Sequence, residues 1–557
     1  MTEHFEVRHR DGPARLGELR LEDPVRTPAL IGDRLADAGS LWVADRSVPE
    51  GDETRLTVLP HRGFPGGTDA EIQDAFAPEY PDVTFPSAAV VTAHTAHDAG
   101  TDAYVLSGAA SVVGDARALV ETVVAVREAT PPDTALLLPG VATPRNVALL
   151  AYAGVDLVDA DRAVVRGTQG RYLTTEGEYD LADLSELPCS CRVCADARPG
   201  DLSREECAEH NRLALDAELR QVRERIRRGR LRDYLEGQVR HVPWLTAAFR
   251  RLDEQWGYLE ERTPVARTAT MDATTEDALR RVEIRRFADR VTSRYTSRFT
   301  DSPLLLVPCS ARKPYSESRS HRAFQDAAGY RAHLVSLTSP IGVVPRELEL
   351  AYPAQHYDAA VTGRWSAEEV EFVGEVLARY LAATDYPRIV AHLPAEYEQV
   401  VERALEDADA PEPTFTVADH PTDEDSLSNL AAALDGERTI PVSEHERATV
   451  RAVAAYQFGA GAGADLFGEF DLQARYPKSR VHADGEQLAA LVPEYGLLAL
   501  TLAGGRRWVE SPVDVRRVEI DDFLPQGSVL APGVVDATDD IRPGDEVEVE
   551  GPSAFAV

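Results

Sequence analysis

The strongest constraint on the fold is a regular alternation of strand and helix patterns between Ala88 and Asp161. Apolar runs of strand length, AAVVTAH, DAYVLSG, TALLLPG and VDLVDAD, alternate with the helical patterns ARALVETVVAVREA and PRNVALLAYAG. This alternation predicts parallel βα units, as in a barrel or an open α/β sheet. Because α/β folds place their chemistry on the loops that follow strands, we expect functional residues at the ends of these runs.

The alternation returns after residue 300. A second α/β pattern begins with SPLLLVPCS and continues through HLVSLTS and RIVAHLP, interrupted by helices such as SAEEVEFVGEVLARYLAA. An acidic, proline-rich stretch follows, which we interpret as a linker or loop. The helix SEHERATVRAVAAYQFGAGAG then leads into a β-rich tail with the predicted strands GLLALTL, RRWVESP and GSVLAPGVV.

The net charge of the chain indicates the salt environment in which it folds, but it does not identify a binding partner. Lys+Arg total 59 against 94 Asp+Glu, a net charge of −35, and only two of the basic residues are lysines, Lys313 and Lys478. We interpret this composition as that of a halophile. In molar salt the Debye length is about 3 Å, so a negative net charge does not exclude nucleic acid as a partner. The beginning of the chain has no apolar signal core and no apolar run reaches membrane-spanning length, so we expect a cytoplasmic protein without membrane contact.

Clustered cysteines predict a metal site. Cys189, Cys191 and Cys194 form a C-x-C-x2-C pattern, and His210 follows with fifteen residues between it and Cys194. Three thiolates and an imidazole fill the coordination of tetrahedral zinc, and a site closed in this way is structural. Cys207 is the alternative fourth ligand; we prefer His210 because it lies at the start of the following helix.

A second group of reactive side chains follows the apolar strand that ends at Pro308. Within thirteen residues the chain presents Cys309, Ser310, Lys313, Tyr315, Ser318 and His321. An arginine-preferring chain keeps a lysine at 313, where an ammonium beside a thiol favours the nucleophilic thiolate. On spacing alone, an inert buried Cys309 beside a solvated Lys313 explains the pattern equally well.

Several segments resemble the tRNA-guanine transglycosylase family, a zinc-containing (β/α) barrel. They are FEVRHRDGPARLGELRLEDPVRTPAL, LPGVATP, GVDLVDAD, GRYLTTEG and the cysteine cluster followed by HN, while YQFGAGAGADLF and the C-terminal region resemble archaeal members with a PUA RNA-binding domain. The resemblance places Asp159 at the position of the base-exchange nucleophile. The family's D-S-G element is not found between Pro60 and Thr101, and the strands before Ala88 are short, so we expect a degenerate barrel retained to hold tRNA.

The second group resembles a more specific motif, P-C-x3-K-P-Y-x2-S-x2-H, which separates the archaeosine synthase family (alpha subunit) from transglycosylases. The motif is complete over residues 308–321. The resemblance implies conversion of the nitrile of 7-cyano-7-deazaguanine at position 15 of tRNA towards archaeosine, with L-lysine as amine donor and a radical-SAM beta subunit as partner. It implies catalytic roles for Cys309, Lys313, Tyr315, Ser318 and His321.

Chemistry gives these residues roles. A thiolate is suited to add to a nitrile carbon, forming a thioimidate that an amine displaces; Cys309 would be this nucleophile, and Lys313 or His321 would stabilise it and protonate the nitrile nitrogen. TSPIGVVPRELELAYPAQHYDAAVTGRW also resembles the family's central domain. Its candidates for the substrate pocket, together with Asp159 in the barrel, are Arg346, Glu347, Glu349, His356, Tyr357 and Asp358. Arg346 would bind the lysine carboxylate and the acids its ammonium.

The segment 221–240 is rich in arginine in a chain where acids dominate. It predicts either a helix that contacts RNA phosphates or a helix face paired by i,i+4 salt bridges, and the sequence does not choose between them. The resemblance of the C-terminal region to a PUA domain is the clearer indication of RNA binding.

These patterns predict an α/β multidomain chain. Its predicted parts are a degenerate TIM-like barrel with a zinc site (1–245), a helical connection (246–300), a central α/β catalytic domain (301–435), a small α+β linking domain (436–475) and a PUA-like domain (476–557). We predict a tRNA-modifying enzyme; a transglycosylase and an inert tRNA-binding scaffold are the alternatives. Self-association into a homo-oligomer is left open.

Overall fold

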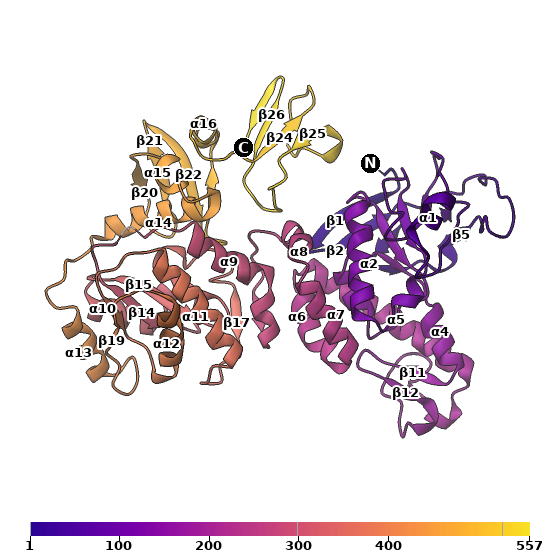
Figure 1. Cartoon of the computed structure of the whole chain (residues 1–557), viewed down its shortest axis with the longest axis horizontal. Helices are drawn as coiled ribbons and strands as arrows, with labels where there is room; N and C mark the ends of the chain where they lie inside the picture. The colour runs from indigo at the N-terminus through magenta and orange to yellow at the C-terminus, as the bar shows by residue number, and fades with distance from the viewer. Residues whose placement is uncertain (1, 298, 526) are drawn as a thin grey trace. The chain divides into compact units, whose positions relative to one another are not determined.

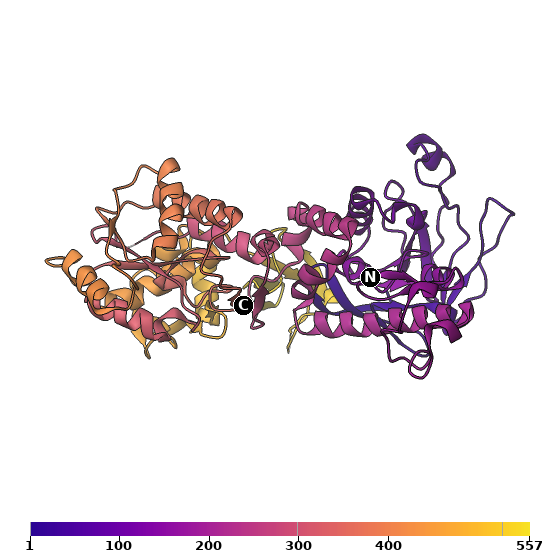
Figure 2. The ribbon, with the colours of Figure 1, turned by 90° about the horizontal axis from the view of Figure 1, so that it is seen from below.

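The structure is a computed structural model that describes residues 2–297, 299–525 and 527–557. The chain divides into two compact units, Met1–Thr263 and Pro264–Val557, which are described separately here. Figure 1 shows their elements, coloured from the N-terminus in indigo to the C-terminus in yellow, and Figure 2 shows the same ribbon from below. Within these residues no helix combines the length and apolar character that a membrane span needs.

A seven-stranded parallel sheet forms the centre of the first unit. Its strands, in spatial order, are β4 (Ala29–Leu30), β10 (Leu157–Val158), β9 (Ala135–Leu138), β8 (Ala103–Leu106), β7 (Ser87–Val91), β6 (Leu56–Val58) and β5 (Leu35–Asp37). This is the circular order of a barrel. The first strand, β4, pairs with the last, β10, and from β10 to β5 each strand lies beside the one that precedes it in the sequence. In the part of the chain that the structure describes, no ladder joins β4 to β5, so the ring is open at that point.

The early half of this barrel is reduced, as the sequence predicts. β4, β5 and β6 contain only two or three residues each. The later half has the predicted alternation, and α2 (Ala116–Ala129) has the predicted bounds. Asp115 caps α2, because its carboxylate accepts hydrogen bonds from the backbone N–H groups of Arg117 and Ala118.

A buried ion pair connects the N-terminal hairpin to this sheet. The hairpin is formed by β1 (Phe5–Asp11) and β2 (Ala14–Leu19). Arg15 and Asp156 are 2% and 1% exposed, and Arg15 Nε donates to Asp156 Oδ1 at 3.1 Å. Asp156 also accepts from the backbone N–H of Leu136 at 2.8 Å, while Arg15 donates to the carbonyls of Pro132 and Thr134 at 2.7 and 2.8 Å. Both charges are therefore held by several hydrogen bonds at once.

The second unit contains a five-stranded sheet that is parallel except for one edge. Its order is β16 (Gly342–Pro345), β15 (His333–Thr338), β14 (Leu304–Pro308), β18 (Ile389–Ala391) and β19 (Thr414–Phe415). Alternate residues of β14 belong to different core clusters, Leu304 and Leu306 to one and Leu305 and Val307 to the other. The first cluster includes α9 (Val282–Ser293), α11 (Ala367–Ala382) and α12 (Glu398–Asp407); the second includes α10 (Arg319–Ala328) and α13 (Glu424–Ala433). Helices thus cover both faces.

The strand order reverses at β14. The chain runs from β14 through α10 to β15 on one side, and it later returns through α11 to β18 on the other side of β14. In open α/β sheets such a reversal leaves a crevice at the carboxyl ends of the strands, where ligands bind. The residue directly after β14 is Cys309.

The C-terminal part of this unit differs from the sequence prediction at two elements. The segment GSVLAPGVV, residues 527–535, is predicted as a strand, but Ala531–Gly533 form a 3₁₀ helix and only its last two residues belong to a strand, which begins at Val534. RRWVESP, predicted as a strand, lies mostly in the helix α16 (Leu502–Glu510). Thr501 caps this helix, and Trp508 on it is fully buried, so packing of this aromatic side chain stabilises a helix where the sequence predicts a strand. Gly504 allows α16 to approach the neighbouring strand, since a Cβ there would lie 2.0 Å from the carbonyl oxygen of Leu488.

Two small sheets complete the second unit. After α14 (Val442–Phe458) and α15 (Ala462–Asp465), the antiparallel strands β20 (Asp471–Gln473), β21 (Arg480–Ala483), β22 (Glu486–Val492) and β23 (Leu497–Leu500) form the first. The second contains β25 (Val534–Ala537), β24 (Arg517–Ile520), β26 (Glu548–Gly551) and β27 (Ala554–Ala556). The tail is thus β-rich, as expected.

Breaking the buried ion pair tests this description of the first unit. Asp156→Ala leaves the Arg15 guanidinium buried without its counter-charge, so we expect the free energy of unfolding of this unit to fall by about 3–5 kcal/mol. The exposed pair of Arg34 and Asp23 supplies the control, because Asp23→Ala should cost less than about 1 kcal/mol. Urea unfolding of the full chain, followed by fluorescence, measures both; equal effects of the two variants would contradict the assignment.

Candidate functional site

Cys309 opens onto a cavity at the carboxyl end of β14. The cavity has a volume of about 480 Å³. Its walls combine the motif loop after β14 with β17 (Tyr357–Ala359), the segment 360–366 and the loop after β18. The side chains that matter for the chemistry are Cys309, Lys313, Tyr357, Asp358, Arg364, Trp365, Glu396 and Tyr397. The cavity therefore lies at the crevice that the strand order creates.

Lys313 faces the same cavity as the thiol. Its Nζ lies 3.9 Å from the centre of the Tyr357 ring, in a cation–π contact. Burial lowers the pKa of Lys313, while the nearby Cys309 and Asp358 act in the opposite direction. The ammonium is therefore a stronger acid than that of an exposed lysine, and it lines the same cavity as the Cys309 thiol.

Three hydroxyl groups, including that of the cavity residue Tyr357, form a hydrogen-bonded chain. Tyr315 Oη lies 2.6 Å from Tyr357 Oη, which lies 2.7 Å from Thr338 Oγ1. Tyr315 is 2% exposed, and burial raises the pKa values of both tyrosines. All three hydroxyls are thus neutral and engaged with one another, and they hold the ring on which Lys313 rests.

Ser318 and His321 support the motif loop from the start of α10. Ser318 Oγ accepts a hydrogen bond from the backbone N–H of His321 at 3.1 Å, which caps the helix. His321 Nε2 donates to the carbonyl of Pro308 at 3.0 Å, and burial lowers the pKa of His321 to about 4. The imidazole is therefore neutral near pH 7, and neither residue is among those that line the cavity.

Of the acidic and basic residues predicted for the substrate pocket in this unit, Asp358 lines the cavity with Cys309. Arg346 is ion-paired with Glu349. Glu349 also accepts from the backbone N–H of Ser316 at 2.9 Å and from Tyr476 Oη at 2.7 Å. Glu349 therefore ties the motif loop to the segment that follows α15.

Glu347 and His356 also lie away from the cavity lining. Glu347 Oε2 accepts hydrogen bonds from His333 Nε2 at 2.9 Å and from Tyr295 Oη at 3.2 Å, in the buried interior. Burial lowers the pKa of His356. Neither residue is among those that line the cavity.

Sequence reasoning missed Trp365 and Tyr397. The two rings make an edge contact at 4.9 Å, and Tyr397 Oη lies 3.9 Å from Cys309 Sγ. Tyr397 follows the strand pattern RIVAHLP, so the rule that parallel strands present their carboxyl ends at one edge could have found it. No such pattern marks Trp365.

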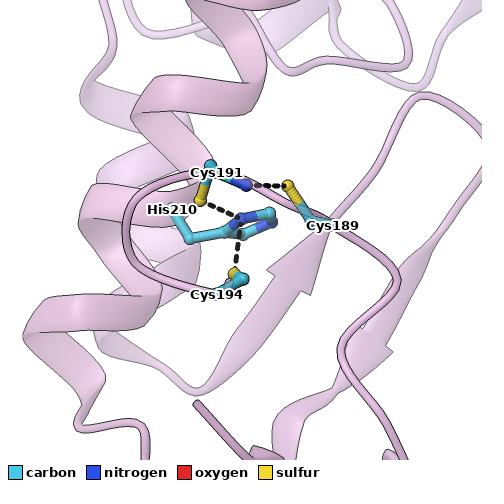
Figure 3. A group of neighbouring side chains, drawn as sticks. All are labelled: Cys189, Cys191, Cys194 and His210. Carbon is cyan, nitrogen blue, oxygen red and sulfur yellow. Dashed lines mark hydrogen bonds between the residues drawn. The ribbon is translucent and has the colours of Figure 1, made fainter. Parts of the chain in front are cut away.

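The predicted metal ligands come together in the first unit (Figure 3). The ligand atoms of Cys189, Cys191, Cys194 and His210 all lie within 4.8 Å of one another. His210 Nδ1 is 3.6 Å from Cys191 Sγ and 3.3 Å from Cys194 Sγ. Tetrahedral coordination with usual bond lengths puts sulfur and nitrogen ligands about 3.5 Å apart. The group therefore fits a four-coordinate metal ion.

Neighbouring groups orient His210. Its Nε2 donates to the carbonyl of Leu173 at 3.0 Å, which leaves Nδ1 for a metal. The Tyr172 ring stacks on the imidazole at 3.8 Å. Cys207, the alternative ligand, lies outside the group, and its thiol is 3.6 Å from the carbonyl of Arg171. The structure thus supports His210 as the fourth member.

Asp159 lies at the carboxyl end of β10. Its two oxygens accept from the backbone N–H of Gly140 at 2.9 and 3.0 Å, and one of them accepts from the N–H of Asp161 at 3.2 Å. Burial raises the pKa of Asp159. The carboxylate therefore joins the loops that follow β9 and β10.

Most arginines of segment 221–240 have partners within the first unit. Arg223 donates to the carbonyl of Pro28 at 2.6 Å, and the buried Arg232 pairs with Asp253. Glu224 pairs with both Arg227 and Arg228 on α5 (Arg204–Arg227) and its C-cap. The paired-helix alternative describes this segment better than a phosphate-contacting face.

Three family models match parts of the chain. "Queuine tRNA-ribosyltransferase" matches residues 83–243, and "Patch-forming domain C2 of tRNA-guanine transglycosylase" matches residues 448–513. Residues 284–434, which include Cys309 and most of the residues that line the cavity, match a domain of unknown function, DUF5591. A crystal structure titled as AF0587, a protein of unknown function, is 30% identical and covers 48% of this chain and 90% of its own, with a TM-score of 0.41.

Curated relatives decide the family. Archaeosine synthase from Haloferax volcanii is 58% identical over 562 residues, which cover 100% of this chain and 95% of the relative. The chain belongs to the archaeosine synthase family. Archaeosine synthase subunit alpha from Methanosarcina acetivorans is 42% identical, with 100% and 96% coverage. A tRNA-guanine(15) transglycosylase from Methanothermobacter thermautotrophicus is 30% identical over 77% of this chain and 63% of its own.

Membership establishes the general activity of the chain. As an archaeosine synthase with a transglycosylase-type domain, it is a tRNA-modifying transferase. The residues that line the cavity beside Cys309 all lie outside the transglycosylase-type segment 83–243, and most of them lie within the region 284–434. The two units of this archaeosine synthase therefore carry different candidate sites.

The metal group makes a direct prediction. Elemental analysis of the purified chain should find about one equivalent of a divalent metal, which Cys191→Ala or His210→Ala should remove, because a closed site needs all four ligands. Cys207→Ala is the matched control and should retain the metal. If His210→Ala retains the metal and Cys207→Ala loses it, Cys207 and not His210 is the fourth ligand.

Proposed function

We propose that this archaeosine synthase converts the nitrile of 7-cyano-7-deazaguanine at position 15 of tRNA into an amidine through a covalent bond to Cys309. The carrying observation is the thiol at the strand reversal, in a cavity of about 480 Å³ that also contains Lys313. Small-molecule sites are typically cavities of about 300–1,000 Å³. A cavity of this size has room for a modified base together with a small amine.

The proposed reaction has two steps with a balanced proton count. In the first, the Cys309 thiolate bonds to the nitrile carbon, one π bond opens, and the nitrogen takes a proton from the Lys313 ammonium to give a thioimidate. In the second, the donor amine bonds to the same carbon, the C–S bond breaks and its electron pair returns to sulfur. The neutral Lys313 amine accepts the proton that the donor loses, so the enzyme is restored.

We propose L-lysine as the donor, bound through its amino-acid end. Asp358 and Glu396 line the cavity and can bind an ammonium. Arg364 lines it as well, and among residues 2–297, 299–525 and 527–557 no carboxylate forms an ion pair with its guanidinium. A free guanidinium suits a carboxylate, which ammonia lacks and lysine has.

The other motif residues hold the site in this proposal. Tyr315, Ser318 and His321 fix the motif loop, whereas Arg346 and Glu349 support it from behind through Ser316. Glu347 and His356 take no part in binding here. Among the residues predicted to bind substrate in this unit, Asp358 keeps a direct role.

We assign zinc to the Cys189, Cys191, Cys194 and His210 group, as a structural ion. Three thiolates and one imidazole are a donor set typical of zinc, and all four positions are filled by protein. When bound, the ion would fasten the loop 189–194 to α5. The terminal sheet of β24 to β27 is proposed to bind RNA as a PUA-like module.

A second protein completes the proposed pathway. Several relatives are named as subunit alpha, which indicates a partner subunit in those organisms. We propose that this chain also works with a partner, a radical-SAM beta subunit that cleaves the lysine adduct. We also propose that the chain is adapted to high salt and acts in the cytoplasm.

Substitution of the nucleophile tests the proposal. Cys309→Ser should abolish nitrile conversion while tRNA binding persists, since an alcohol is a far weaker nucleophile than a thiolate. Lys313→Met should slow conversion by about 10²–10⁴-fold through loss of the general acid, and Lys478→Met is its matched control. Nucleoside masses after incubation of nitrile-bearing tRNA with lysine, glutamine or ammonia in high salt provide the measurement. Full activity of Cys309→Ser would exclude the covalent route.

Substitution of Asp159 distinguishes the proposed nitrile conversion from base exchange. A transglycosylase loses catalysis with this carboxylate, whereas nitrile chemistry leaves the glycosidic bond intact. Asp159→Ala should therefore retain nitrile conversion, with any defect in tRNA affinity, because its oxygens bind the backbone of Gly140 and Asp161. Incorporation of radiolabelled guanine by the wild type, lost in this variant, would favour the transglycosylase reading.

A further inference from the structure

One wall of the cavity presents a hydroxyl to the thiol from a distant part of the chain. Tyr397 ends the short 3₁₀ helix Ala395–Tyr397, which follows β18 on the side of β14 opposite β15. Its Oη lies 3.9 Å from Cys309 Sγ, a distance compatible with an O–H to sulfur hydrogen bond. Tyr397 belongs to neither the cysteine motif nor the segment 338–365.

We propose that Tyr397 is a catalytic residue that donates a hydrogen bond to the Cys309 sulfur and stabilises it as a thiolate, both before attack and when it leaves the thioimidate. This inference rests on the proposed function, because it requires Cys309 to be the nucleophile. It adds a residue that the motif does not contain.

The backbone and a neighbouring ring hold Tyr397 in place. Its N–H donates to the carbonyl of Pro394 at 2.9 Å, and the Trp365 ring meets its ring edge-on with an angle of 76°. Within the described part of the chain, Cys309 is the partner recorded for its hydroxyl. A donor fixed in this way costs little reorganisation when charge develops on sulfur.

Tyr357, which also lines the cavity, and its buried neighbour Tyr315 cannot take this role as readily. The hydroxyls of Tyr315 and Tyr357 bond to each other, and that of Tyr357 also bonds to Thr338. A donor engaged in that chain would have to break a short hydrogen bond to reach sulfur. Tyr397 is therefore the tyrosine placed to act on the thiol.

Tyr397 keeps its proton throughout the reaction. Burial and the nearby Cys309 raise its pKa, so the phenol stays neutral at working pH. The proton that reaches the nitrile nitrogen comes from Lys313, and the electron pair of the broken C–S bond returns to sulfur. Tyr397 donates a hydrogen bond at both stages without a net transfer, so the balance of the two steps is unchanged.

The pH dependence of thiol alkylation tests the contact without any substrate. The full chain is treated with iodoacetamide at a series of pH values, and labelling of the Cys309 peptide is followed by mass spectrometry. Tyr397→Phe removes only the hydroxyl, and it should move the midpoint of the profile upward by about one pH unit, because a hydrogen bond to a charged group is lost. Tyr330→Phe, at a 40% exposed tyrosine in the same unit, is the matched control and should leave the midpoint in place.

A kinetic measurement separates catalysis from folding. Tyr397→Phe should lower kcat for nitrile conversion by about 10- to 100-fold with KM for tRNA unchanged. An unchanged alkylation midpoint would overturn the proposal, whatever happens to kcat.

The outcome is distinguishable from failure of the proposed function. If Cys309→Ser keeps full activity, the covalent route fails, and the catalytic role of Tyr397 fails with it. If Cys309→Ser is inactive while Tyr397→Phe matches the wild type in both measurements, only the role of Tyr397 is excluded.

Discussion

The double pairing of β14 is the constraint on which the candidate active site depends. Leu304 pairs with His333 on one side and with Ile389 on the other, so two parallel ladders fix the register of this strand. Parallel ladders bring the carboxyl ends of the three strands to one edge. Cys309, Thr338 and Tyr397 therefore meet at this edge, although 88 residues separate the cysteine from the tyrosine. Loss of that register would separate the nucleophile from its neighbours.

The motif around Cys309 contains residues that face the cavity and residues that hold the loop in place, and the sequence does not distinguish the two groups. Cys309 and Lys313 face the cavity, whereas Tyr315 and His321 are buried and hold the loop by hydrogen bonds to Tyr357 and Pro308. A buried neutral imidazole fixes a backbone carbonyl without adding charge beside the thiol. This division explains why a spacing argument finds all of these residues together but cannot assign their roles.

Local patterns predicted the parts of the fold that local physics determines. The bounds of α2, the apolar strand before Cys309 and the cysteine cluster follow from periodicity, capping and ligand spacing. Contacts that require long-range pairing were not predictable in this way: Tyr397 reaches the site only through the neighbouring strand. Arg346 and Glu347 have suitable charges for the pocket, but they follow the antiparallel strand β16, whose last residue pairs with Val335 near the start of β15. They therefore lie away from the edge that carries Cys309, and Glu347 accepts a hydrogen bond from His333. The segment of α16 around the buried Trp508 is predicted as a strand, but it is helical.

The open ring of strands in the first unit has a consequence for aggregation. An unclosed sheet has two edges, and exposed edges are templates on which further strands can add. Here those edges are β4 and β5, with two and three residues. Strands this short offer few free backbone groups to a second chain, so the barrel can lose closure without becoming a seed for edge-to-edge aggregation.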